Sequence, residues 1–241
     1  MEQMTIFGDI HGNLPALTAV YHHLNTHHNH RRFCLGDLVG YGVKPNEVVG
    51  FIREHDIPTL MGNYDYGVGH DSDDCGCAYK TPDAQELGKR SIAWTNAHVT
   101  ADHKAYLRNL PMTMMVLLGK LRVALVHGSP RRINEYLYAD RPEASLARLL
   151  DLAGADVLVC GHTHLPYHRT LPDGRHVINA GSVGKPKDGD PRAGYVVLTA
   201  VSNHLTVEFV RVPYDIEQAA QAIEATTMPH EFAHMLRTGT G

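Results

Sequence analysis

The sequence lacks the long apolar runs and the excess of one charge that mark several classes of protein. Its most apolar stretch covers residues 110–118, whereas a membrane-spanning helix needs about 20 apolar residues. With 22 basic and 26 acidic side chains the net charge is −4, which gives no reason to expect binding of long nucleic acids. The first residues, MEQMTIF, have neither a basic flank nor an apolar core. We therefore expect no secretory signal and no contact with a membrane.

Cysteine is scarce, with four residues in the chain. Cys34 and Cys160 lie in apolar, strand-like runs, and a single glycine separates Cys75 from Cys77. The latter two are too close in sequence for an ordinary structural disulfide. We expect free thiols, buried in a protein of the reducing cytoplasm.

Short β-branched runs alternate with helical patterns in the first half of the chain, which is typical of an α/β fold. We predict strands at 4–7, 32–35 and 58–61 and helices at 13–27 and 45–55. The region 66–110 reads as an insert: a Gly- and Asp-rich loop over 66–80, then two helical stretches.

The second half continues with strands and two further helical patterns. We predict a hairpin of strands 112–118 and 122–127, a helix at 143–152, strands at 156–160, 176–179, 195–198 and 205–212, and a helix capped by Asp215. The amphipathic C-terminal pattern includes Phe232, and the final Gly-Thr-Gly reads as a frayed tail. No repeat or linker interrupts the chain, so we predict one domain over 1–241.

Five short fragments place metal-ligand side chains directly after predicted strands. They are Asp9-Ile-His11, Gly36-Asp37, Gly62-Asn63, His127-Gly128 and Gly161-His162-Thr163-His164. Open α/β sheets bind ligands at the carboxyl ends of their strands, so these fragments can meet at one edge. Mixed nitrogen and oxygen donors suit Mn²⁺, Fe or Zn²⁺ better than Ca²⁺. The predicted ligands are Asp9, His11, Asp37, Asn63, His127, His162 and His164.

The ordered motifs D-x-H, GD, GN-x-D, H-G and GH-x-H resemble those of the calcineurin-like metallophosphoesterase superfamily, most closely its small bacterial and archaeal phosphodiesterases. The resemblance implies an α/β (α+β) fold, a four-layer sandwich of two mixed β-sheets flanked by helices. It also implies two divalent cations, with Mn²⁺ favoured over Fe and Zn²⁺. By resemblance, Asp9, His11 and His164 bind the first cation, Asn63, His127 and His162 bind the second, and Asp37 bridges both.

Two neighbouring cations can lower the pKa of a bound water and clamp a displacement at phosphorus. The expected reaction is therefore attack of a metal-bound hydroxide on a phosphodiester or a nucleotide phosphoanhydride. Two alternatives stay open: a phosphatase acting on small phosphomonoesters, and a non-catalytic metal-binding scaffold of the same fold. We expect a small phosphorylated substrate, with nucleotides among the candidates, and a homo-oligomer is an open possibility.

The third motif departs from the family's usual GNH and reads Gly62-Asn63-Tyr64-Asp65. The Tyr64 phenol either donates a proton or hydrogen bond or only shapes the pocket. A simple alkoxide needs a proton to leave, so the missing histidine favours substrates with good leaving groups. The candidate catalytic residues are Tyr64, Asp65 and Arg131, and the candidate substrate contacts are Asn63, Arg131, Arg132, Ser182 and Lys185.

The loop over 66–80 permits two interpretations. Because it directly follows Asn63, we favour a loop that bounds the active-site cleft. The alternative is a metal-binding or redox pair formed by Cys75 and Cys77. An EF-hand is excluded, because Pro82 stands where that motif requires glutamate.

Overall fold

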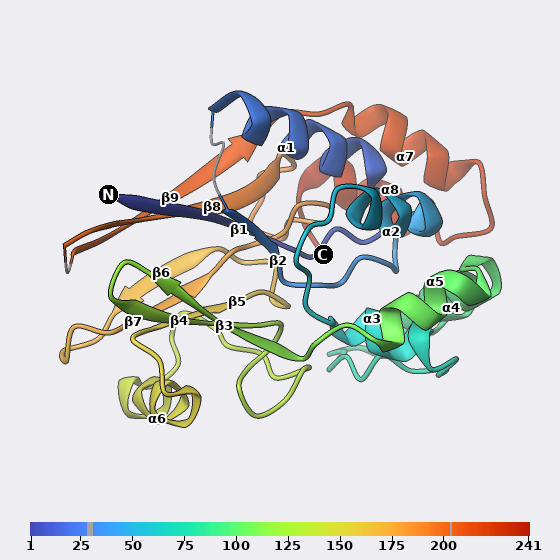
Figure 1. The fold of residues 1–241 in the computed structure, drawn as a ribbon. Helices are drawn as coiled ribbons and strands as arrows, with labels where there is room; N and C mark the ends of the chain where they lie inside the picture. The colour runs from blue at the N-terminus through green and yellow to red at the C-terminus, as the bar shows by residue number, and fades with distance from the viewer. Residues whose placement is uncertain (28–30, 203) are drawn as a thin grey trace.

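Two β-sheets packed face to face form the centre of the protein (Figure 1). The computed structural model describes residues 1–27, 31–202 and 204–241. Its strands are β1 (Glu2–Phe7), β2 (Arg31–Cys34), β3 (Thr113–Leu118), β4 (Leu121–Val126), β5 (Val157–Cys160), β6 (Tyr167–Thr170), β7 (His176–Asn179), β8 (Ala193–Val201) and β9 (His204–Val212). One sheet has the order β2-β1-β8-β9 and the other β3-β4-β5-β7-β6. Both are mixed, since each combines parallel and antiparallel pairs.

Helices complete a four-layer sandwich. They are α1 (Leu14–His27), α2 (Pro45–Glu54), α3 (Asn63–Gly69), α4 (Pro82–His98), α5 (Ala101–Arg108), α6 (Glu143–Ala153), α7 (Ile216–Glu224) and α8 (Glu231–Thr238). In Figure 1, α1 and α7 lie above the four-stranded sheet and α6 lies below the five-stranded sheet. This arrangement confirms the predicted fold class. Among the described residues, no helix is long and apolar enough to span a membrane.

Strict alternation along the strands separates the apolar layers. Met4 and Ile6 of β1 face the core between the sheets, while Phe7 packs beneath the helices on the outer face. On β4, Leu125 joins the core between the sheets and Val126 packs with the α6 layer. A one-residue slip in either strand would exchange these faces, so burial of both faces fixes the register.

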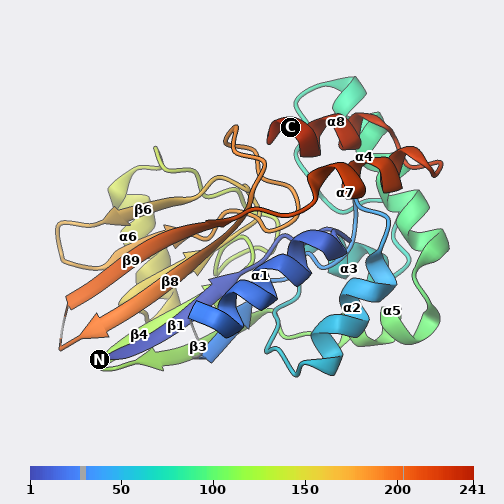
Figure 2. The same ribbon diagram turned by 90° about the horizontal axis from the view of Figure 1, so that it is seen from above.

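The parallel strands determine where functional side chains gather. β1 and β2 run parallel, and so do β4, β5 and β7. Figure 2 shows α2–α5, α7 and α8 clustered at one end of the strands, away from the N-terminus. The loops after β1, β2, β4 and β5 therefore meet among these helices.

Two predictions between β2 and α4 are wrong. The predicted strand at 58–61 is only an isolated bridge between Thr59 and Cys34, because the Gly62 amide, next in line after that of Leu60, donates to the Asp65 carboxylate instead of extending the ladder. The predicted loop over 66–80 begins in helix, since α3 extends to Gly69. Its first turn is held by Asp65, whose carboxylate accepts a hydrogen bond from the Gly62 amide (2.9 Å).

Two further differences lie in the second half. β6 was not predicted, and it pairs antiparallel with β7 over four residues. The terminal Gly-Thr-Gly is not frayed at its start, because the Gly239 carbonyl accepts a hydrogen bond from the Gly189 amide (2.9 Å). The predicted cap is confirmed: Asp215 Oδ1 accepts a hydrogen bond from the Gln218 amide at the start of α7.

Candidate metal centre

The predicted ligands converge at the carboxyl ends of four strands. They form two groups, Asp9–His11–His164 and Asp37–His127–His162, in each of which the ligand atoms lie within 4.8 Å of one another. Asn63 joins the second group, because its Oδ1 lies 2.9 Å from His127 Nε2. Asp37 connects the groups: its Oδ2 lies 3.6 Å from His11 Nε2 and 3.4 Å from His127 Nε2. All seven side chains are buried.

Left-handed backbone turns aim these side chains at one point. Nine non-glycine residues of the described chain have positive φ, and five of them are predicted ligands: Asp9, His11, Asp37, His162 and His164. Such conformations cost about 1–3 kcal/mol each and concentrate at functional sites. Flanking glycines allow the close approach, since a Cβ on Gly62 would lie 2.1 Å from Asp37 Oδ1 and one on Gly161 2.4 Å from Asp9 Oδ2.

Main-chain carbonyls orient three of the four imidazoles. The Nδ1 atoms of these rings contact backbone oxygens, joining His11 to Val39 (3.0 Å), His127 to Leu35 (2.9 Å) and His164 to Lys185 (2.5 Å). With the hydrogen on Nδ1, the neutral rings of His11 and His164 present their Nε2 lone pairs to the centre. The Nε2 atoms of His11 and His164 face each other at 3.1 Å. Two lone pairs at this distance repel unless a cation lies between them.

A buried nitrogen without a partner supports the same conclusion. Among the described residues, His162 Nε2 has no hydrogen-bond partner and no access to solvent. Buried polar atoms are nearly always satisfied, so an imidazole nitrogen without a protein partner beside Asp37 and His127 fits a metal-ligand atom. Carboxylate, amide oxygen and imidazole donors fit a divalent transition metal.

The titration behaviour of the site follows from its burial. Burial lowers the pKa of His11 to about 3 and holds the pKa values of His162 and His164 well below their ordinary value. These imidazoles are therefore neutral near pH 7, the form that binds metals. Burial also lowers the pKa of His127, but the nearby Asp37 carboxylate outweighs it and brings the value to about 9.

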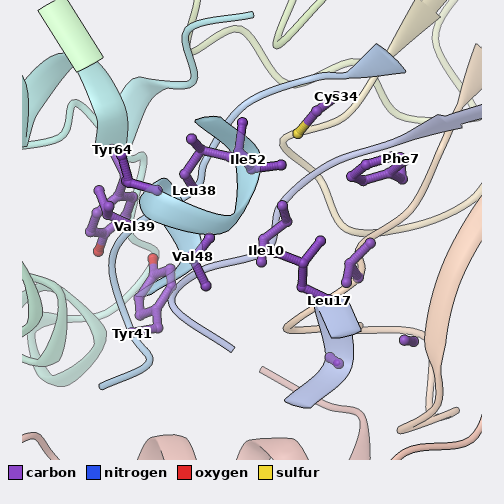
Figure 3. Packing of buried hydrophobic residues seen from close by; sticks show 14 of the residues in the cluster. Phe7, Ile10, Leu17, Cys34, Leu38, Val39, Tyr41, Val48, Ile52 and Tyr64 are labelled. Carbon is purple, nitrogen blue, oxygen red and sulfur yellow. The ribbon is translucent and has the colours of Figure 1, made fainter. Parts of the chain in front are cut away.

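Tyr64 and Asp65 lie behind the ligands. The Tyr64 ring packs against His11 (centroids 5.6 Å apart) and Tyr41 (4.7 Å), and its hydroxyl lies 3.3 Å from the Tyr79 hydroxyl. Figure 3 shows the Tyr41 and Tyr64 rings close together in the apolar cluster. Asp65 uses both carboxylate oxygens to accept hydrogen bonds from backbone amides of the loops that carry Asp37 and Asn63, each at 2.9 Å.

The predicted substrate contacts are more dispersed. Arg131 is exposed and forms an ion pair with Glu135, and Arg132 is exposed beside it. Ser182 is buried, donates to the Asp9 carbonyl (2.7 Å) and accepts from the Lys185 amide (2.8 Å). The structure thus brings the loop of Ser182 and Lys185 to the centre, while the two arginines lie at the surface.

Three residues near the centre were not predicted as site residues: Tyr136, Lys187 and Cys77. The Tyr136 ring lies 4.1 Å from the His162 ring, measured between centroids. Tyr136 and Lys187 line a cleft of about 440 Å³, together with Tyr79, Tyr138, Thr163 and Lys185. Cys77 Sγ accepts a hydrogen bond from Asn63 Nδ2 (3.2 Å). Lys187 had a signal in its place two residues after Lys185, and Cys77 had one in the Cys-Gly-Cys pattern, whereas Tyr136 had none.

Comparison with known proteins agrees with this geometry. A profile of the calcineurin-like phosphoesterase superfamily domain matches residues 3–203. The chain is 31% identical to an uncharacterized protein of Methanocaldococcus jannaschii, over 98% of each chain. A metallophosphoesterase of Sphaerobacter thermophilus is similar in structure, with a TM-score of 0.77, 28% identity and 99% of each chain covered. A hypothetical protein of Pyrococcus horikoshii shares the fold, with a TM-score of 0.84, 23% identity and 99% of each chain covered.

Proposed function

The chain belongs to the calcineurin-like phosphoesterase superfamily, whose members are metal-dependent phosphoesterases, and we propose that it hydrolyses phosphodiesters or nucleotide phosphoanhydrides with two divalent cations. The cations would be held by Asp9, His11, Asp37, Asn63, His127, His162 and His164. Mn²⁺ is the proposed metal, with Fe and Zn²⁺ as alternatives, because these ions accept mixed nitrogen and oxygen donors.

The observation that carries this proposal is the position of Asp37. Its carboxylate lies between two groups of ligands, 3.6 Å from His11 and 3.4 Å from His127, and it is only 2% exposed. A shared carboxylate holds two cations near each other, which a site for one ion does not need. When bound, such a pair supplies positive charge to phosphoryl oxygens and lowers the pKa of water.

The residues behind the ligands support a substrate with a good leaving group. Burial raises the pKa of Tyr64 well above its ordinary value, and its hydroxyl is engaged by Tyr79 at 3.3 Å. General acids work best when their pKa lies near the working pH. Tyr64 is therefore a poor proton donor to an alkoxide, whereas aryl and phosphate leaving groups depart without a proton.

The cleft beside His162 supports a substrate with an organic group attached to phosphorus. Tyr136 and Tyr138 stack with their centroids 5.8 Å apart and a 15° angle between their planes. Lys185 and Lys187 line the same cleft, where burial lowers the pKa of both amines below the ordinary value and a bound phosphate would favour their protonated form. Aromatic rings bind planar groups by stacking, and ammonium groups attract phosphate oxygens. A nucleotide or an aryl phosphodiester presents both features.

A substrate panel tests the proposal. The Mn²⁺-loaded protein is assayed with bis-p-nitrophenyl phosphate, a dinucleoside polyphosphate, glycerol phosphate and DNA, and its metal content is measured in parallel. We expect two equivalents of metal, turnover of the first two compounds and none of DNA. Faster hydrolysis of glycerol phosphate would instead identify a phosphomonoesterase. Two bound metals without turnover of any compound would favour the non-catalytic scaffold.

A further inference from the structure

The insert after α3 brings two cysteines against a candidate metal ligand. Asn63 Nδ2 donates hydrogen bonds to the Cys75 carbonyl (3.0 Å) and to Cys77 Sγ (3.2 Å). Because a carboxamide has one oxygen, these two bonds direct Asn63 Oδ1 toward His127, whose Nε2 is 2.9 Å away. The cysteine segment therefore fixes the orientation in which Asn63 can bind a cation.

The two sulfurs also touch each other. Cys75 Sγ and Cys77 Sγ are 2.9 Å apart. Gly76 between them has a φ of +69°, in the left-handed region, and turns both side chains to one side. This turn is anchored at both ends, since the Gly76 amide donates to Asp74 Oδ1 (2.8 Å) and its carbonyl accepts from Asn134 Nδ2 (2.8 Å). The thiols are thus held together by the fold.

Small molecules from solution can reach this pair. Cys75 and Cys77 line a surface depression of about 540 Å³. Cys34 and Cys160, in contrast, are fully buried and belong to different apolar clusters. Cys75 is buried (7% exposed) and Cys77 is half-buried, so an oxidant in this depression reaches the pair through Cys77, whose sulfur lies 2.9 Å from that of Cys75.

We propose that Cys75 and Cys77 form a reversible disulfide, and that only the reduced pair holds Asn63 ready to bind a cation. This inference rests on the proposed metal centre. The oxidant is a low-molecular-weight disulfide, RSSR. One cysteine thiolate attacks a sulfur of RSSR, which forms a mixed disulfide and releases one RSH. The other cysteine sulfur then attacks the protein sulfur of the mixed disulfide, which closes the bridge and releases the second RSH. The two thiol protons leave with the two RSH molecules, so the protein loses two hydrogens and RSSR is reduced.

Closing the bridge disturbs both partners of Asn63. The sulfurs approach from 2.9 Å to about 2.05 Å. Since one residue separates the cysteines, the ring also constrains the peptide that carries the Cys75 carbonyl. Both acceptors of Asn63 Nδ2 therefore shift together. Loss of the groups that orient a metal ligand typically weakens metal affinity by about 10–100-fold.

Oxidation followed by metal titration tests the inference. The full-length, metal-free, reduced protein is treated with oxidised glutathione, and intact mass and peptide mapping locate the bridge. Mn²⁺ is then titrated calorimetrically into the reduced and oxidised forms. We expect a Cys75–Cys77 bridge, an affinity for one Mn²⁺ that is lower by about tenfold or more, and recovery of that affinity after reduction. Protein that stays unbridged in excess oxidised glutathione, or a bridge that leaves Mn²⁺ affinity unchanged, would overturn the inference.

Two variants serve as matched controls. Cys75→Ser cannot form the bridge but keeps the Cys77 sulfur and the main-chain carbonyl, so its Mn²⁺ affinity should not respond to oxidised glutathione. Cys160→Ala removes a buried thiol outside the pair and should respond like the wild type. An oxidant-dependent loss of affinity that persists in Cys75→Ser would contradict the proposal.

A metal-free measurement separates this inference from the proposed function. In ¹⁵N-labelled protein without metal, the side-chain amide signal of Asn63 should shift when the bridge forms and return on reduction. An unmoved signal refutes the coupling between the cysteines and Asn63. Failure of the reduced protein to bind Mn²⁺ refutes the metal centre instead, and it does so whatever the amide signal shows.

Discussion

Replacement of Asp37 by asparagine is the sharpest test of a paired metal centre. Asparagine has nearly the same shape and tolerates the left-handed backbone at this position, where φ is +53°. Its Oδ1 can still accept the hydrogen bond from the Tyr64 amide, which is 2.9 Å long with the carboxylate. The substitution therefore removes one negative charge and leaves the local fold in place.

The expected loss can be estimated from the position of that charge. One elementary charge about 4 Å from another is worth about 4 kcal/mol at an effective dielectric constant near 20. This energy corresponds to roughly a thousandfold in a dissociation constant. Because Asp37 Oδ2 lies close to imidazoles of both ligand groups (3.6 and 3.4 Å), both cations should be affected.

Metal-linked stability makes this loss measurable without substrate. At a free Mn²⁺ concentration about a thousandfold above the wild-type dissociation constant, each bound ion stabilises the fold by about 4 kcal/mol. The Asp37→Asn variant at the same concentration should gain only about 0.4 kcal/mol per site. Urea unfolding with and without Mn²⁺, together with elemental analysis, gives both quantities. Asp173→Asn, at an exposed carboxylate paired with Arg175, is the control. An Asp37→Asn variant that keeps two equivalents of metal and the full stabilisation would refute the reasoning.

Three further substitutions test the residues around the centre. Tyr64→Phe should keep both Mn²⁺ ions and slow turnover of an aryl phosphodiester by less than about tenfold, as measured by steady-state kinetics. The loss of a general acid would instead cost about 10²–10⁴-fold, so a loss above a hundredfold would make Tyr64 the proton donor. Asp65→Ala leaves two buried backbone amides without an acceptor. Each unsatisfied amide costs about 1–3 kcal/mol, so the free energy of unfolding should fall by about 2–6 kcal/mol. An unchanged midpoint of urea unfolding would contradict this. Burial alone would raise the pKa of Glu135, but Arg131 and other partners hold it at about 2. Compared with a Glu135→Gln variant, ionised Glu135 therefore stabilises the folded protein at pH values above the ordinary pKa of glutamate. This stabilisation is lost as the pH falls toward 2. The gap in urea midpoint between wild type and variant should be smaller near pH 3 than near pH 7, and equal gaps would be inconsistent with the ion pair.

Local sequence patterns predicted the strands that precede six of the seven ligands, all except Asn63, which begins α3. An apolar run that ends in Gly-Asp or His-Gly indicates both a strand and the turn after it, as at Asp37 and His127. The rule that ligands gather at the carboxyl ends of strands then placed these residues at one edge. The structure confirms that they lie together, and metal binding by them stays a prediction.

The elements that were missed depend on contacts between distant parts of the chain. The helix α3 contains Gly67 and Gly69 and has no apolar period, so no local pattern indicates it. It is tied to the preceding loop by Asp65, which accepts hydrogen bonds from Gly62 next to it and from Leu38, 27 residues earlier. The contact of Cys77 with Asn63 spans 14 residues of an irregular insert. Such pairs become visible only when the chain is folded.

The orientation of the imidazoles shows why a ligand set can be predicted before its geometry. The rings of His11, His127 and His164 are aimed by carbonyl oxygens of Val39, Leu35 and Lys185. Any residue type presents a carbonyl, so these partners leave no trace in the sequence. The left-handed backbone at five of the ligands has an energetic cost of about 1–3 kcal/mol each, and the Nε2 atoms of His11 and His164 face each other at 3.1 Å. Strained turns, buried carboxylates and opposed lone pairs at one point are all features that a bound cation would offset.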